Sequence, residues 1–159
     1  MSKLTSATFA ALAATLVGLG SLVSAPSASA AEMPMTGQWR ACDFSKQKWV
    51  EAVGYARPTA HLTNDSGTLR ATIDINTAVP YTHYDVRVIQ TPRASIGCAP
   101  GAPGVITGGL QTDGVGAGTT TMQGAVPSGA TGAWVIVERP SDHSQTPAEF
   151  YTTDYVAPI

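Results

Sequence analysis

The chain has 159 residues, and only 13% of them are charged, with 9 basic against 11 acidic side chains. The net charge is therefore small, and both signs are interspersed along the chain. Such a distribution does not attract phosphate backbones, so we expect no nucleic-acid partner. Charged residues are about 25% of an ordinary soluble domain, and here glycine, proline, threonine and alanine stand in their place. Such a composition favours short strands and tight turns.

The N-terminal segment has the pattern of a secretory signal peptide. Lys3 is the only charge before Glu32, and residues 7–23 are an almost unbroken apolar run. Ala28-Ser29-Ala30 then supplies the small residues that signal peptidase requires. We predict a signal peptide over 1–30, cleaved after Ala30, with cleavage one residue later as the close alternative.

A membrane anchor is the competing interpretation, because about 18 apolar residues suffice to span a bilayer. The small-residue cleavage region and the lack of Lys or Arg just after the apolar run argue against it. We therefore expect no membrane span after signal cleavage, and an extracellular or cell-envelope location. Residues 31–159 are then one exported domain of ordinary size.

Two cysteines lie in this domain, Cys42 and Cys98. An exported chain with two cysteines usually pairs them, so we predict a disulfide bond between them. Two unpaired thiols, the alternative, suit a cytosolic protein better.

Two segments alternate clearly between apolar and polar residues. Residues 68–76 place Leu69, Ala71, Ile73 and Ile75 on one face, and residues 83–91 place Tyr84, Val86 and Val88 on one face. A period of two residues predicts half-buried strands.

Residues 97–132 hold 11 glycines but are not expected to be a linker. Residues 105–111 and 117–126 are rich in threonine and β-branched residues, and Thr112-Asp113-Gly114 between them predicts a hairpin turn. The apolar run within 133–139 indicates a strand covered on both faces, and residues 149–156 are expected to form the last strand.

The segment before residue 67 is harder to interpret. Residues 38–44 favour a strand, and residues 49–55 fit either a strand or one helical turn. No long segment shows a helical period with caps, so about seven strands predict an all-β sandwich or open barrel.

Several short motifs, taken together, resemble a known pattern. They are Tyr84-Asp85-Val86-Arg87, a cysteine-containing loop, Gly109 to Asp113, Gly116-Ala117-Gly118, Trp134-Val135 and Phe150-Tyr151. The succession is similar to that of small exported actinobacterial proteins of mycobacterial type, β-sandwiches of unknown function. This resemblance implies a single Ig-like β-sandwich. The chain also resembles chordin-type and copper-zinc dismutase sandwiches, but it has no counterparts of their metal-binding histidines.

Metal and cofactor chemistry have little support in the sequence. His83 and Asp85 share one strand face, but a complete site needs His61 or His143 as well, and zinc usually takes three protein ligands at a catalytic site. We therefore predict no metal site and no cofactor, and keep a metal-binding module as an alternative function.

Catalytic motifs are also missing. No Gly-x-Ser-x-Gly elbow occurs, and no spacing marks a carboxylate pair, so we assign no catalytic residue and keep a small secreted hydrolase as an alternative. Tyr151 and Tyr155 share a predicted strand face and form a possible exposed aromatic binding row. The expected function is a noncatalytic binding or structural module, with an unknown protein or an envelope carbohydrate as its partner.

Overall fold

The computed structural model describes residues 29–51 and 54–159 and is all-β, as predicted. Within these residues, no helix has the length and apolar character needed to cross a membrane. The predicted signal peptide lies outside the described residues except for its last two positions, which belong to the first strand. The strands are β1 Ser29–Thr36, β2 Gln38–Arg40, β3 Lys46–Glu51, β4 Thr59–Asp65, β5 Thr68–Ile75, β6 His83–Thr91, β7 Val105–Gln111, β8 Gly118–Ala125, β9 Gly132–Arg139, β10 Glu149–Thr153 and β11 Ala157–Pro158.

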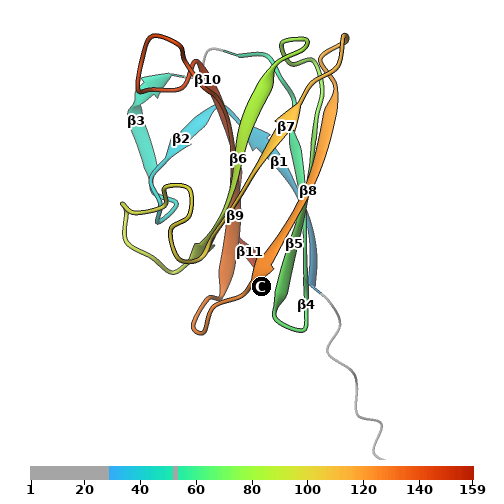
Figure 1. Ribbon diagram of the computed structural model, residues 1–159. Coiled ribbons are helices and arrows are strands. Elements are labelled where there is room, and N and C mark those ends of the chain that lie inside the picture. The colour runs from blue at the N-terminus through green and yellow to red at the C-terminus, as the bar shows by residue number, and fades with distance from the viewer. Residues whose placement is uncertain (1–28, 52–53) are drawn as a thin grey trace, which may run out of the picture.

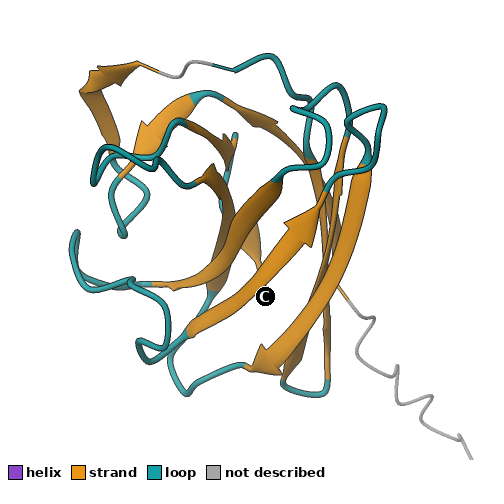
Figure 2. Ribbon diagram, turned by 45° about the horizontal axis from the view of Figure 1, so that its top comes forward, coloured by secondary structure: helices purple, strands orange, loops and turns teal. Residues whose placement is uncertain are grey.

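Nine of these strands form one antiparallel sheet that curls into a near-barrel (Figures 1 and 2). Eight follow the order β7-β6-β9-β10-β1-β4-β5-β8, and β11 pairs with β9. β1 joins the two halves, because Ser29–Pro34 pair with β4 while Met35 and Thr36 pair with β10. The expectation of about seven strands was too low, chiefly because β1 and β4 were not recognised.

The ends of this path, β7 and β8, meet through side chains. A Cβ atom on Gly108 of β7 would lie 2.6 Å from the Met122 Cε of β8, and one on Gly124 of β8 would lie 2.7 Å from the Ile106 Cγ1 of β7. Each strand thus leaves room for a side chain of the other, and the seam closes by packing.

The predicted hairpin over residues 112–114 is therefore wrong in its pairing, although the turn itself is present. β7 pairs with β6, and β8 pairs with β5. Asp113 Oδ1 accepts hydrogen bonds from the backbone N–H groups of Val115 and Ala117, at 3.0 and 2.9 Å. These bonds fold the loop locally, so it carries the chain from one half of the near-barrel to the other.

The main core fills the inside of the near-barrel, and the predicted alternation supplies it. β5 buries Leu69, Ala71, Ile73 and Ile75, as expected. β6 likewise buries Tyr84, Val86 and Val88, while β9 contributes alternate residues from Ala133 to Val137. The long alternating segments were correctly predicted because one face of each meets this core.

A second, smaller layer covers the outer face of β6 and β9. It consists of the β2–β3 pair and the loop over 92–104 (Figure 1). The apolar cluster beneath it comprises Cys42, Ile89, Cys98, Trp134 and Ile136. β9 is buried from residue 132 to 137, which confirms the prediction of a strand covered on both faces.

The predicted strand over 38–44 is shorter than expected. β2 ends at Arg40, and a turn follows in which the Ala41 N–H donates to the Ser45 carbonyl oxygen at 2.9 Å. Phe44 adopts a positive φ of 71° in this turn. Cys42 therefore lies in a turn beside the outer face of the sheet. For residues 49–55, the strand interpretation holds up to Glu51, where β3 ends.

Candidate ligand cavity over β6 and β9

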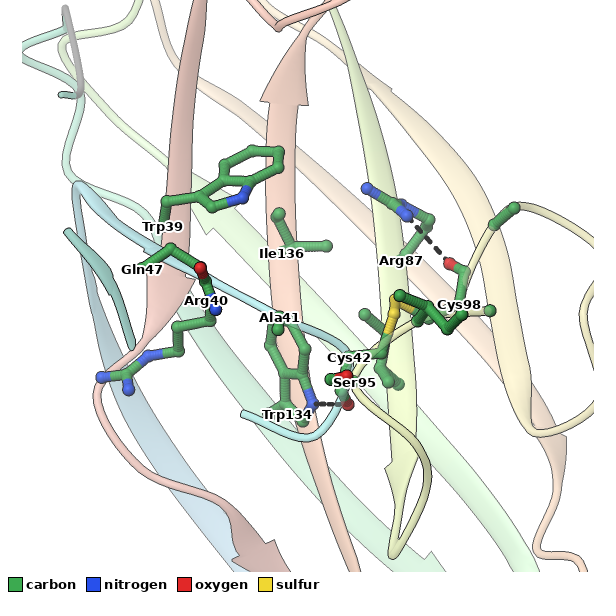
Figure 3. Close-up of a pocket in the computed structure, with 14 residues that line it drawn as sticks. Trp39, Arg40, Ala41, Cys42, Gln47, Arg87, Ser95, Cys98, Trp134 and Ile136 are labelled. Atoms are coloured by element: carbon green, nitrogen blue, oxygen red, sulfur yellow. Dashed lines mark hydrogen bonds between the residues drawn. A yellow bond between two sulfur atoms is a disulfide. The ribbon is translucent and has the colours of Figure 1, made fainter. Parts of the chain in front are cut away.

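A cavity of about 490 Å³ lies between the two parts of the outer layer. β6 and β9 form its floor, with Ile89, Trp134 and Ile136. Trp39 lies on one side of Ile136, and Arg87 with the disulfide lies on the other (Figure 3). The remaining lining residues are Arg40, Ala41, Gln47, Ser95, Ile96, Gly97 and Ala99. The volume falls within the range of small-molecule sites.

The predicted disulfide between Cys42 and Cys98 is present and joins the turn after β2 to the 92–104 loop, the two parts of the outer layer that flank the cavity. Two hydrogen bonds reinforce it. The Cys42 N–H donates to the Ser95 carbonyl oxygen at 3.1 Å, and Arg87 Nη1 donates to the Cys98 carbonyl oxygen at 2.8 Å. The 92–104 loop is thus tied both to the turn after β2 and to β6, and these links position the two sides of the cavity.

Aromatic rings fix the opposite wall and the floor. Trp39 packs edge to face on Phe150 of β10, with ring centroids 4.7 Å apart, and Phe44 packs on Trp134 at 5.6 Å. The Trp134 indole N–H donates to the Cys42 carbonyl oxygen at 3.4 Å, so its one polar atom has a partner (Figure 3). These contacts present a preformed and mainly apolar surface.

The two arginines of the lining both interact with other parts of the chain. Arg87 forms an ion pair with Glu138, whose side chain is 13% exposed. The Arg40 guanidinium points away from Ile136 (Figure 3), lies 3.8 Å from the centre of the Phe44 ring, and donates to the carbonyl oxygens of Phe44 and Asp154. Burial lowers the pKa of Arg40, and the negative charge of Asp154 partly offsets that effect. None of the lining residues is an aspartate, glutamate or histidine.

A second group of ionisable residues surrounds Glu149, which is 3% exposed. Its Oε1 accepts hydrogen bonds from the hydroxyls of Tyr84 and Tyr151, at 2.8 and 3.1 Å, and its Oε2 accepts one from Arg139 Nε at 3.1 Å. Each tyrosine oxygen also accepts a backbone N–H, from Val79 or Ala56. Both carboxylate oxygens are engaged, so this cluster fastens two loops to β10.

The tyrosines of this cluster titrate at unusually high pH. Burial, reinforced by the hydrogen bond to Glu149, raises the pKa of Tyr84 to about 12. Burial is also the largest cause of the raised pKa of Tyr151. Both hydroxyls therefore remain protonated donors to the carboxylate throughout the physiological range.

The proposed aromatic row of Tyr151 and Tyr155 does not form on the surface. β10 ends at Thr153, and all five of its residues are buried, with Tyr151 3% exposed. Tyr155 lies in the bend after β10, and its hydroxyl donates to the Glu32 carbonyl oxygen at 2.7 Å. The prediction was wrong because it extended one strand through this bend. The most exposed tyrosines are Tyr55 and Tyr81, which lie in loops.

The histidines lie apart from the cavity. His83 Nε2 is 3.2 Å from Asp85 Oδ1, as expected from their shared face, and His61 Nε2 is 3.7 Å from Asp74 Oδ2. In the part of the chain that the structure describes, no three His, Cys, Asp or Glu residues gather as a metal site.

The cavity was not predicted from the sequence, although one signal pointed to it. The doubly covered β9 required an outer layer, but which residues line the gap in that layer depends on the path of residues 92–104. No protein-family model matches the chain, and no curated protein matches it.

Proposed function

We propose that this protein is a noncatalytic binding module and that the cavity over β6 and β9 is its ligand site. The single observation that carries this proposal is a preformed, mainly apolar cavity flanked by two parts of the outer layer that a disulfide joins. Rigid walls reduce the ordering cost of binding, which favours affinity for a small ligand or a single protruding group.

We further propose that residues 1–30 are a signal peptide and that the protein acts outside the cytoplasm. The disulfide supports this location, because such bonds persist mainly in oxidising compartments. Similarity to small exported actinobacterial proteins and an Ig-like fold belong to the same proposal. They are supported by the all-antiparallel strand pairing and by Trp134, which lies in one apolar cluster with Cys42 and Cys98.

Binding is favoured over hydrolysis by the chemistry of the residues at hand. The cavity lining contains no carboxylate or imidazole that could serve as a general base. The buried carboxylate of Glu149 lies elsewhere, beside a space of about 210 Å³, and its oxygens already accept hydrogen bonds from Tyr84, Tyr151 and Arg139.

The test compares small molecules carried by the exported protein and by a variant with a filled cavity. Ile136→Trp adds bulk to the floor, and we expect mass spectrometry of solvent extracts to show loss of a compound that co-purifies with the wild type. Ile96→Glu is the second variant, since this rim residue is 79% exposed and its change spares the core.

Val115→Glu provides the matched control, because Val115 is equally exposed at 79% but lies in the loop between β7 and β8. It should retain the compound. Equal compound content in all four proteins, or no compound and no binding of any apolar probe by the wild type, would contradict the proposal.

A further inference from the structure

The cation beside the cavity floor is paired with an anion before any ligand enters. Arg87 is the one lining cation whose guanidinium lies beside the floor, and Glu138 already pairs with it from the neighbouring strand β9. Both side chains are largely buried, at 15% and 13% exposure. A ligand anion next to Arg87 would therefore meet the Glu138 carboxylate in a poorly solvated place, where like charges repel strongly.

The side chains on the two sides of the cavity favour a flat ligand. Trp39 and Arg87 lie on opposite sides of Ile136 (Figure 3), and both the indole and the guanidinium are planar groups that stack on rings. The floor between them is made of branched aliphatic and indole surface. A flat apolar ring can rest on this floor and contact the planar group on either side.

We infer that the ligand of this cavity is a neutral, mainly apolar molecule that carries an aromatic or other flat ring. The inference rests on the proposed function and adds the chemical class of the ligand. The Arg87–Glu138 ion pair is the reason to expect a neutral ligand, and the planar groups of Trp39 and Arg87 are the reason to expect a ring.

Two fluorescent probes test the charge, because they share one skeleton. N-phenyl-1-naphthylamine is neutral, and 8-anilinonaphthalene-1-sulfonate adds a sulfonate to it. We expect the neutral probe to saturate at one per protein and to bind at least about tenfold more tightly than the anion. Tighter binding of the sulfonate by the wild-type protein would overturn the inference.

The variant Glu138→Gln tests the physical cause. It keeps the shape of the side chain but leaves Arg87 without its counter-ion, so the preference for the neutral probe should fall by about tenfold. Asp85→Asn is the matched control, since it changes the net charge equally, and Asp85 pairs with His83 rather than with Arg87. An unchanged ratio in Glu138→Gln would also overturn the inference.

Ring selectivity is measured by displacement of the neutral probe. 1-Naphthol should displace it at lower concentration than 1-decanol, which has the same number of carbons. The reverse order would contradict the inference that the ligand carries a flat ring. Failure of the proposed function gives a different result: neither probe binds, or Ile96→Glu and Val115→Glu leave binding of both probes equal to that of the wild type.

Discussion

Removal of the disulfide should destabilise the protein without changing its main core. In the chain-entropy model, a crosslink across 56 residues restricts the unfolded chain by about 4 kcal/mol at 25 °C. Cys42 and Cys98 belong to the outer cluster, and the alternating residues of β5 and β6 that form the core do not touch this crosslink. The variant Cys42→Ala/Cys98→Ala should therefore keep its strands while losing much of its resistance to denaturant.

Urea titration followed by far-ultraviolet circular dichroism measures this loss. With an m value of about 2 kcal/mol per molar, the midpoint should fall by about 2 M. Reduced wild-type protein is the control, because it keeps both sulfur atoms and should show a similar fall. The reasoning fails if the midpoint moves by less than about 0.5 M, or if the variant has no strand signal in the absence of urea.

Four further predictions concern other parts of the molecule. Glu149→Ala leaves two buried hydroxyls and Arg139 without their acceptor and should cost about 3 kcal/mol of unfolding free energy, measured by urea titration; a loss below about 1 kcal/mol would contradict the role given to the cluster. Because the pKa of Tyr84 is raised in the folded state, its contribution to the free energy of unfolding should be constant below pH 10 and decrease between pH 10 and 12. Tyr84→Phe should reduce this decrease, and an unchanged dependence of the free energy of unfolding on pH would contradict the prediction. Gly124→Ala should cost about 1–3 kcal/mol through contact with Ile106, and Ile106→Ala should offset part of this cost in the double variant; strictly additive losses would show that the two sites do not touch. Intact mass of the exported protein should place its first residue at Ala31 or Glu32, and recovery of all 159 residues from membranes would rule the signal peptide out.

The parts of the fold that could be predicted are those in which one strand face meets the core. The alternation of residues 68–76 and 83–91 reports this contact directly, and both strands were found with nearly the expected bounds. β4 was missed although it is paired on both sides, because its outward residues include the threonines and histidine of Thr59–Thr63 and its inward residues include small Ala60. An apolar period is weak in such a strand.

The site was harder to predict than the fold because it depends on contacts distant in sequence. Arg87 lines the cavity through its partners Cys98 and Glu138, which lie 11 and 51 positions away. The failure at Tyr151 has a local cause, since a bend after Thr153 ends the alternation that placed Tyr151 and Tyr155 on one face. Sequence patterns specify which residues are buried more readily than which loop covers them.

The division of β1 between two partners has a consequence for the order in which this chain can fold. Its first part binds β4, which follows soon in the sequence, but Met35 pairs with Thr153 near the other end of the chain. The nearly closed structure therefore cannot be completed until the C-terminal strands have been synthesised. Until β10 arrives, Met35 and Thr36 lack their backbone partners, so the last step of folding has to wait for the C-terminal strands.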